Sequence, residues 1–278
     1  MALLTPATIT DLLARHGLRP SRALGQNFLA DPNTARRIVR LAGIEARDAV
    51  LEIGPGVGSL TAALVDAGAR VTALELDRHL LSALAEVVAH APTPVRIVPG
   101  DALTVDLDAL LIPNPAGWKV VSNLPYNVAT PIVVRLLEDA PTVRSLLVMV
   151  QREVGERLAA GPGGKDYGAV SVKVAYYGRS RVVGLVPPTV FLPPPKVESA
   201  LVRIDRHAAP PVAVPSVPAL FTLVRAGFGQ RRKMLRRALQ SALGARTAAV
   251  LAAAGVDPEA RAESLDLDAW AAIARAAA

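Results

Sequence analysis

The stretch LEIGPGVGSL, from Leu51 to Leu60, decides the fold of this 278-residue chain. It opens with an apolar run typical of a buried strand, and Gly54, Gly56 and Gly58 then stand at alternate positions. Glycine lets the backbone turn sharply and approach a ligand closely. A helix that starts after such a turn offers free N–H groups to a carboxylate or phosphate. The stretch predicts a strand, a ligand-binding turn and a helix; the alternative is a turn that uses glycine only for packing.

Strand-like and helix-like segments alternate around this turn, from Ala49 to about Gln151. The runs that predict strands are AVLEIG (49–54), RVTALEL (70–76), VRIVPGD (95–101), WKVVSNL (118–124) and SLLVMVQ (145–151). Helices are predicted at 32–42, between Asp31 as cap and Gly43 as stop, at 59–67 and 78–90, and at 130–138 with Thr130 as cap. This alternation predicts an α/β fold, a Rossmann-like parallel sheet with helices on both faces.

The pattern changes after Tyr167. SVKVAYYGRSRVVGLV (171–186) and SALVRIDR (199–206) predict further strands, and HAAPPVAVPSVP (207–218) is typical of an extended, proline-rich connector. The pattern beyond the connector is helical. We therefore expect an α/β domain over residues 1–210 and a smaller all-helical domain over residues 211–278. An N-terminal arm, residues 1–30, begins with an amphipathic helix that is expected to end at Gly17.

Two acids follow the next two predicted strands. Glu75 lies about 20 residues beyond the glycine turn, where a carboxylate can bind a ribose diol. Asp101 lies just past the third strand, where it can accept a hydrogen bond from an adenine amine. A dinucleotide fingerprint needs glycine or alanine at position 59, which is serine here. A ligand with adenine, ribose and an amino-acid tail, such as S-adenosylmethionine, fits better than NAD.

The stretch SNLPYNVATP, residues 122–131, ends the fourth predicted strand with an amide and an aromatic ring. Ligands of open α/β sheets bind beyond the carboxyl ends of the strands, which puts Asn123 beside the cofactor. Its side-chain carbonyl and the backbone carbonyl of Leu124 can accept both hydrogens of an exocyclic amine. Pro125 stiffens the turn, and Tyr126 offers a face on which a base can stack. The pattern suits methyl transfer to an adenine amine; the alternative is a strand-end turn in which Asn123 caps the backbone.

Composition narrows the chemistry. The chain carries 31 Lys and Arg against 24 Asp and Glu, a formal charge of +7, which favours a polyanionic partner, although a basic proteome gives the same excess. Cysteine is absent and the four histidines are scattered, so we expect no disulfide, no Cys nucleophile and no metal. No apolar run reaches the ~20 residues of a bilayer span, and the N-terminus lacks a secretory pattern. We expect a cytoplasmic protein without a membrane partner.

Taken together, these motifs resemble the small-subunit (16S) ribosomal RNA adenine dimethyltransferases, the family whose loss confers kasugamycin resistance. The resemblance covers most of the chain and rests on LGQNFLAD (24–31), LEIGPGVGSLT (51–61), ELD (75–77), GDAL (100–103), NLPYNVATPIV (123–133), VQREVGERL (150–158), YGAVSV (167–172), FLPPPKVESALV (191–202) and GFGQRRKMLRRAL (227–239). It implies transfer of methyl groups from S-adenosylmethionine to the N6 amines of two adjacent adenosines in a hairpin loop near the 3′ end of 16S rRNA. The products would be N6,N6-dimethyladenosines. We expect a monomer that acts on a small-subunit (30S) assembly particle.

The resemblance also implies roles for single residues. Those that would hold the cofactor are Asn27 and Leu29 of the arm, Gly54 at its methionine part, Gly56 beside it in the glycine turn, Glu75 at its ribose, Asp101 at its adenine, and Asn123 between methyl donor and target. Phe191 would be the second ring, opposite Tyr126, around an adenine flipped from its stack. Flipping costs a few kcal/mol, and less for a base that starts in a loop.

A basic segment in the predicted helical domain, RAGFGQRRKMLRRALQ (225–240), contains no acid. We expect a helix on which positions 232 and 236, and 233 and 237, share faces. Such a helix would bind RNA phosphates and set register without reading bases; the alternative is a solvated face. The cations that we expect to contact RNA are Arg231, Arg232, Lys233, Arg236 and Arg237.

Two other functions are compatible with parts of this pattern. The related large-subunit (23S) rRNA methyltransferases of macrolide resistance share the glycine turn and an Asn-x-Pro-aromatic motif. YGAVSV, GQRRKMLRRAL and Leu124 resemble the small-subunit family more closely. A non-catalytic assembly or transcription factor of the same fold is the second alternative, and the intact 123–126 motif argues against it.

Overall fold

A computed structural model of the chain describes residues 3–21 and 25–278, so Leu24 of the LGQNFLAD motif lies outside the described residues. The chain forms two compact units. The first unit comprises Met1–Gly155 and Arg181–Arg206, and the second comprises Glu156–Ser180 and His207–Ala278. These units differ from the predicted division at 210/211 chiefly over residues 156–180. That segment joins the second unit because Tyr167, Val172 and Tyr176 pack in its apolar core.

A seven-stranded sheet in the order β4-β3-β2-β5-β6-β9-β7 forms the centre of the α/β region. Its strands are β2 (Ala49–Ile53), β3 (Arg70–Glu75), β4 (Arg96–Pro99), β5 (Trp118–Asn123), β6 (Val143–Gln151), β7 (Gly178–Val186) and β9 (Ser199–Arg206). The strands from β4 to β6 run parallel, whereas β9 pairs antiparallel with β6. The predicted Rossmann-like fold is confirmed, with antiparallel strands added at one edge.

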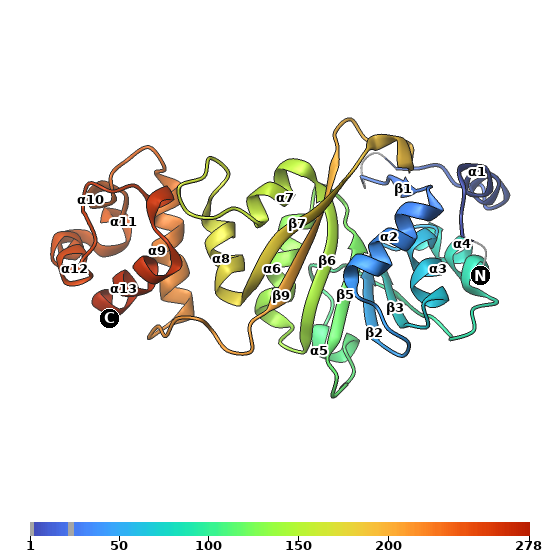
Figure 1. The fold of residues 1–278 in the computed structure, drawn as a ribbon, viewed down its shortest axis with the longest axis horizontal. Coiled ribbons are helices and arrows are strands. Elements are labelled where there is room, and N and C mark those ends of the chain that lie inside the picture. The colour runs from blue at the N-terminus through green and yellow to red at the C-terminus, as the bar shows by residue number, and fades with distance from the viewer. Residues whose placement is uncertain (1–2, 22–24) are drawn as a thin grey trace. The chain divides into compact units, whose positions relative to one another are not determined.

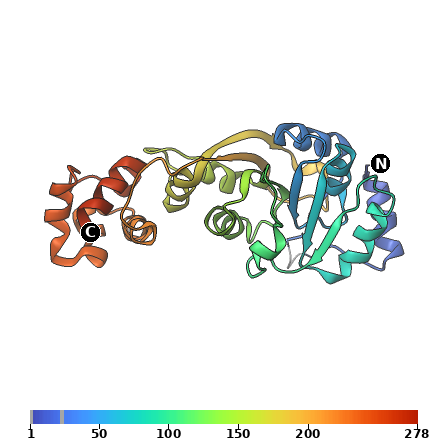
Figure 2. The same cartoon turned by 90° about the horizontal axis from the view of Figure 1, so that it is seen from below.

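Helices cover both faces of this sheet. Those of the first unit that pack on it include α2 (Pro32–Ala42), α3 (Ser59–Asp66), η1 (Arg78–Leu80), α4 (Leu81–Val88), α5 (Leu107–Leu110) and α6 (Ala129–Asp139). In Figure 1, α2 and α3 lie in front of the sheet and α6 lies behind it, and Figure 2 shows α2 and α6 on opposite sides. The apolar faces of α2, α3 and α4 share one buried cluster with the sheet. The helices therefore bury the parallel strands on both sides.

The predicted cap of α2 is confirmed, and the predicted cap of α6 is wrong. The side chain of Asp31 accepts hydrogen bonds from the backbone of α2, and Gly43 ends that helix at φ 61°. The cap of α6 is Val128 rather than Thr130, because the backbone N–H of Ile132 already bonds to the carbonyl of Val128. Thr130 is the second residue of the helix, so the helix starts two residues earlier than the sequence suggested.

The N-terminal arm packs beside the glycine turn. Its helix α1 (Pro6–Arg15) buries Ile9 and Leu12 in a cluster with Phe28 and Val57. The short strand β1 (Phe28–Leu29) pairs antiparallel with β8 (Phe191–Leu192), which follows a 3-10 turn, η2 (Pro188–Val190). Two stretches far apart in the sequence, the arm and the FLPPP segment, thus meet in one two-stranded sheet.

The second unit is helical, as the sequence after residue 219 predicts. Its elements are α8 (Ala169–Tyr177), α9 (Val217–Gly229), α10 (Leu235–Ala238), α11 (Gln240–Leu243), η3 (Gly244–Arg246), α12 (Thr247–Ala253), η4 (Ala262–Ser264) and α13 (Leu267–Ala277), while α7 (Arg152–Leu158) crosses from the first unit. The strand predicted at 171–186 is wrong over 171–177. Val172 and Tyr176 stand four residues apart, and as a helix they bury one face against Phe221.

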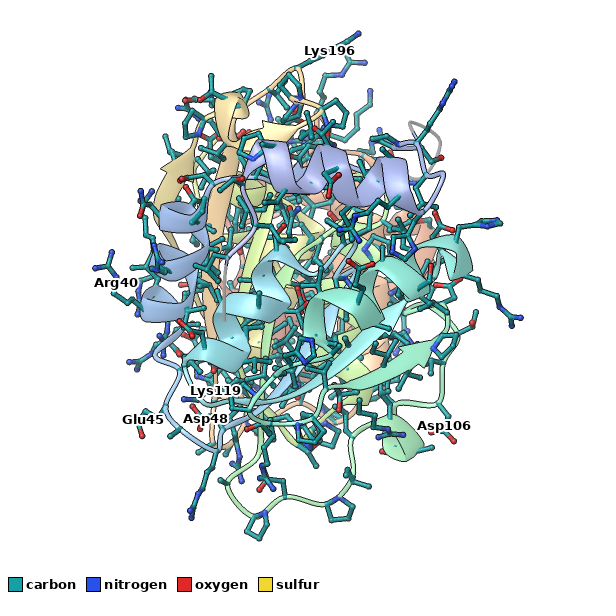
Figure 3. All side chains as sticks on the ribbon, turned by 90° about the vertical axis from the view of Figure 1, so that its right-hand side faces the viewer. Arg40, Glu45, Asp48, Asp106, Lys119 and Lys196 are labelled. Atoms are coloured by element: carbon teal, nitrogen blue, oxygen red, sulfur yellow. The ribbon has the colours of Figure 1, made fainter. Side chains whose placement is uncertain are left out.

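The two ends of the parallel strands carry different chemistry. At the amino end, Lys119 of β5 binds Asp48 at 2.7 Å and the carbonyl of Gly43 at 2.7 Å. Figure 3 shows Lys119 and Asp48 together at one end of the sheet and Lys196 at the other. Ligands of open α/β sheets bind beyond the carboxyl ends of the strands, which is the end opposite this ion pair. Among the described residues no helix is both long and apolar enough to cross a bilayer.

Candidate active site

A pocket opens at the carboxyl ends of β2, β3 and β5. About 980 Å³ of it is unfilled by atoms, part of that space being open to solvent. Its wall is made by the glycine turn, the three strand ends and the arm. The predicted site residues that line it are Asn27, Leu29, Gly54, Gly56, Glu75, Asp101, Asn123, Leu124, Pro125 and Tyr126. Segments separated by up to a hundred residues thus converge on one cavity.

The glycine turn needs glycine for two separate reasons. Gly54 and Gly56 both lie in the left-handed region, at φ 66° and 58°, which side chains rarely tolerate. In addition, a Cβ at Gly56 would lie 2.9 Å from the ring of Phe28 and would clash with it, whereas one at Gly54 would make an ordinary contact with Pro125 at 3.4 Å. The turn can therefore pass closely between the arm and the Asn123–Tyr126 motif. The contact with Phe28 shows that the turn uses glycine for packing, and its approach to a ligand stays a prediction.

Glu75 is held in a fixed orientation against this turn. Its Oε2 accepts the N–H of Gly56 and its Oε1 accepts the N–H of Asp77, both at 2.9 Å. Only 5% of the residue is exposed, and burial raises the pKa of its carboxyl group, although the two hydrogen bonds act in the opposite direction. Each oxygen keeps a lone pair, so the carboxylate can still accept hydrogen bonds from a diol.

Asp101 organises the loop that follows β4. Its Oδ1 accepts the N–H of Leu103 at 2.8 Å, and its backbone carbonyl accepts the N–H groups of Thr104 and Val105. The loop is therefore a compact turn, and both Asp101 and Leu103 face the pocket. A carboxylate tied in this way presents its remaining lone pairs at a defined place.

Two polar residues of the pocket were missed by sequence reasoning. Glu52 is 1% exposed in β2, and its Oε2 accepts a 2.6 Å hydrogen bond from Thr61. Burial, with a smaller contribution from Glu75, raises the pKa of Glu52 to about 8. The hydroxyl of Ser59 is buried at the start of α3 and has no protein partner among the described residues. The sequence features that could have indicated these two residues are an acid inside an apolar strand, for Glu52, and a serine directly after the glycine turn, for Ser59.

Asn123 is oriented by the arm. Its Nδ2 donates to the backbone carbonyl of Asn27 at 3.1 Å, a contact across 96 residues of sequence. The carbonyl oxygen of the same amide is not used in this hydrogen bond, and Asn123 lines the pocket. The N–H of Leu124 bonds to Met149 at 3.0 Å, which fixes the strand end next to it. The alternative in which Asn123 caps its own turn is not what the hydrogen bonds show.

The two aromatic residues of the predicted stack differ in their surroundings. Tyr126 lines the pocket, and its hydroxyl lies 2.6 Å from that of Ser199, a residue of β9 with no exposed surface. Burial raises the pKa of this tyrosine. Phe191 is 4% exposed and does not line the pocket; it packs in the core cluster with Leu29 and Leu201. The pairing of Phe191 with Leu29 nevertheless ties it to the pocket wall.

The basic segment is not one helix. α9 ends at Gly229, residues 230–234 form a turn, and α10 starts only at Leu235. The turn is fixed by a β-bridge between Met234 and Arg261 and by a 2.8 Å bond from Leu235 to the carbonyl of Ala260. Positions 232 and 236 therefore do not share a helix face as predicted. The sequence hid this break because no proline marks it and long-range pairing causes it.

Acids from elsewhere in the second unit neutralise part of the basic segment. Arg231 pairs with Glu263 at 2.9 Å and donates to the carbonyl of Lys165, while Arg236 lies 3.4 Å from Glu259. Among the described residues no acid lies within ion-pair distance of the other three cations, which are Arg232, Lys233 and Arg237. Within residues 3–21 and 25–278, no group of three or more His, Asp or Glu side chains could hold a metal ion.

This fold and this pocket define a methyltransferase that uses S-adenosylmethionine. The family model for Ribosomal RNA adenine dimethylase matches residues 18–278. The chain is 48% identical over 273 residues to Ribosomal RNA small subunit methyltransferase A of Leifsonia xyli subsp. xyli, which covers 96% of both chains. It is also 48% identical over 278 residues to the protein of that name from Thermobifida fusca, covering 98% of this chain and 95% of the other. The chain therefore belongs to the ribosomal RNA adenine dimethylase family.

Two solved structures share the fold over most of the chain. The 23S rRNA methyltransferase ErmE superposes with a TM-score of 0.68 at 27% identity, covering 90% of this chain and 99% of that one. A dimethyladenosine transferase from Plasmodium falciparum superposes with a TM-score of 0.72 at 22% identity, covering 88% and 95%. The resemblance to the dimethylase family is confirmed, and the enzyme is an S-adenosylmethionine-dependent rRNA adenine dimethyltransferase.

Proposed function

We propose that the enzyme dimethylates the N6 amines of two adjacent adenosines in the 3′-terminal hairpin loop of 16S rRNA. It acts as a monomer on a small-subunit (30S) assembly particle in the cytoplasm. The names of relatives that match at 48% identity support a small-subunit substrate. The observation that carries the chemistry is the orientation of Asn123, whose Nδ2 is held by the carbonyl of Asn27.

The pocket offers a partner for each part of S-adenosylmethionine. The buried hydroxyl of Ser59, which has no protein partner among the described residues, and the free N–H groups at the start of α3 suit the methionine carboxylate. The fixed carboxylate of Glu75 suits the ribose diol, and Asp101 suits the adenine amine. Asn27 and Leu29 close the pocket from the arm, with Gly54 and Gly56 at its floor.

The catalytic residues act by holding the target amine. When bound, S-adenosylmethionine supplies an electrophilic methyl group on a sulfonium sulfur. The Oδ1 of Asn123 and the backbone carbonyl of Leu124 accept the two hydrogens of the adenine amine, which favours a pyramidal nitrogen with a free lone pair. With S-adenosylmethionine held beside it, that lone pair would be free to accept the methyl group, and the sulfonium would leave as a neutral thioether. The methylated nitrogen then loses a proton, because it is far more acidic than the starting amine, so no strong base is needed.

Tyr126 supports the target base from one side. Its hydroxyl is fixed by Ser199, so its ring presents a stable face to a flipped adenine. We assign Phe191 to the other face of the flipped adenine. Its link to the pocket is the β1–β8 pair, in which it lies opposite Leu29. Pro125 lies against Gly54 and links this wall to the glycine turn. In the second unit, Arg232, Lys233 and Arg237 are the proposed phosphate contacts, and Arg231 and Arg236 contribute mainly through their ion pairs.

One experiment tests the substrate directly. Unmethylated small subunits and separated large subunits are each incubated with the enzyme and labelled S-adenosylmethionine, and the rRNA is digested to nucleosides. We expect label only in the small subunit, in N6,N6-dimethyladenosine. Label confined to the large subunit would assign the enzyme instead to the function named for its structural neighbour, the 23S rRNA methyltransferase. Label in neither would contradict both.

A further inference from the structure

The loop that carries Asp101 is held from within by the hydrogen bonds of that one residue. Residues 101–105 form only turns, and the bonds inside the loop use the side chain and carbonyl of Asp101. The loop nevertheless forms one wall of the pocket through Asp101 and Leu103. Contacts from a neighbouring element add to the local stability of such a short loop.

Arg135 of α6 binds this loop from the protein side. Its Nη1 donates to the carbonyl of Ala102 at 2.6 Å and its Nη2 donates to the carbonyl of Val105 at 2.5 Å. Its Nε lies 3.5 Å from Asp139, one turn further along the same helix. All three guanidinium nitrogens are therefore engaged, and the side chain is only 21% exposed. A planar guanidinium can hold two carbonyls in a fixed geometry, which an ammonium cannot.

The helix that carries Arg135 starts directly after the catalytic motif. Asn123 to Tyr126 lead through a short turn into α6, whose apolar residues Ile132 and Val133 are buried. Arg135 therefore joins the segment that holds the target amine to the loop that holds one end of the cofactor pocket. Hydrogen bonds from a charged donor are stronger than neutral ones, so the two bonds from Arg135 stabilise the conformation of this five-residue loop.

We propose that Arg135 is a positioning residue that sets the cofactor affinity by fixing the Asp101 loop against α6. Its side chain does not line the pocket. The inference rests on the proposed function only in taking Asp101 as a cofactor contact. Loss of the two hydrogen bonds from Arg135 to the loop weakens S-adenosylmethionine binding and raises the KM for this cofactor. The kcat at saturating cofactor and the KM for RNA change little.

The test compares Arg135→Gln and Arg135→Lys with a matched variant, Arg206→Gln. Arg206 also binds backbone carbonyls of the end of α6, those of Leu136, Leu137 and Ala140, but far from the Asp101 loop in sequence and outside the pocket lining. S-adenosylmethionine binding is measured by calorimetry, together with the melting temperature of each variant. We expect about tenfold weaker binding for Arg135→Gln, a smaller loss for Arg135→Lys, and unchanged binding for Arg206→Gln despite a lower melting temperature.

A double-mutant cycle separates positioning from general loosening of the helix. In an Asp101→Asn background, Arg135→Gln should weaken binding much less than in the wild type, because both changes act on the same loop contact. Unchanged affinity in both Arg135 variants, equal losses in Arg206→Gln, or strictly additive losses in the cycle would each overturn the proposal. Binding needs no RNA, so failure of small-subunit methylation would refute the proposed function without affecting this result.

Discussion

The two compact units differ most in their charge. The first unit holds 18 Lys and Arg against 17 Asp and Glu, whereas the second holds 13 against 7 in about half the length. Nearly all of the net charge of +7 thus lies in the second unit. The first unit instead places four carboxyl groups, those of Glu52, Glu75, Asp77 and Asp101, around its pocket.

This difference separates two tasks that would conflict in one surface. A pocket for a cationic methyl donor is served by carboxyl groups, which would repel RNA phosphates if they were exposed. The phosphates are attracted by cations elsewhere, and this attraction carries no sequence information. In the proposed function, selection of the target base is left to Asn123 and Tyr126, in the near-neutral unit. The predictions below probe each task alone.

Removal of the Asn123 amide should give the largest effect. Asn123→Ala should lower the single-turnover methylation rate by at least about a hundredfold, since one of two acceptors for the target amine is lost. RNA affinity in a filter-binding assay should stay within about twofold, because the basic unit is untouched. Asn33→Ala, at an exposed residue of α2, serves as the control. Full methylation by Asn123→Ala would refute the assigned role, and lost RNA binding would refute the separation of tasks.

The buried acid of the pocket should make stability depend on pH. The pKa of Glu52 is about 8 in the folded protein against an ordinary value of 4.5, so between these values the folded state binds a proton that the unfolded state lacks. Its contribution to stability is therefore complete below pH 4.5 and is lost as pH rises toward 8. Glu52→Gln removes this dependence and keeps an acceptor for Thr61.

Denaturant unfolding at pH 5 and pH 8 measures the effect. We expect the wild type to lose more stability than Glu52→Gln over this range, by a difference of the order of 2 kcal/mol. Glu75→Gln gives a second comparison, because burial raises the pKa of that carboxyl group as well. Equal pH slopes in the wild type and in Glu52→Gln would show that Glu52 is ionised in the folded protein.

Neutralising cations of the basic unit should weaken RNA binding without slowing chemistry. The sequence pattern alone pairs Arg232 with Arg236, but Arg236 lies beside Glu259. We therefore expect Arg232→Ala with Lys233→Ala to lower RNA affinity about tenfold and to reduce the salt slope by nearly 2. Arg231→Ala should change the slope less, since it also breaks the pair with Glu263. An unchanged salt slope in the double variant would show that these cations face solvent and do not contact RNA phosphates.

The smallest effect concerns the tyrosine hydroxyl. Tyr126→Phe and Ser199→Ala should each raise the KM for RNA a few-fold, because each removes the same hydrogen bond behind the stacking ring. The double variant should be no worse than either single one. Tyr126→Ala should be clearly worse, since it removes the stacking face itself. Additive losses in the double variant would mean that Ser199 acts independently of Tyr126.

Local patterns explain why much of the fold was predictable. The cap at Asp31, the stop at Gly43 and the alternation of strands and helices depend on neighbours in sequence, and all recur in the structure. The strand prediction failed over residues 171–177 because the apolar spacing there suits a strand as well as a helix. Packing of this segment against Phe221 favours the helix. The prediction of one helix across Gly229 also failed because of a contact far along the chain, which here is the bridge between Met234 and Arg261.

The site divides along the same line. The sequence by itself determined the glycine turn, the acids at the strand ends and the Asn123–Tyr126 motif, because each is a short run whose chemistry follows from its own residues. Only the tertiary structure decided that Asn27 orients Asn123, that Ser199 fixes Tyr126, that Arg135 holds the Asp101 loop and which cations of the second unit are paired. These are contacts between residues far apart in the chain, and their partners are set by how the elements pack rather than by any local pattern.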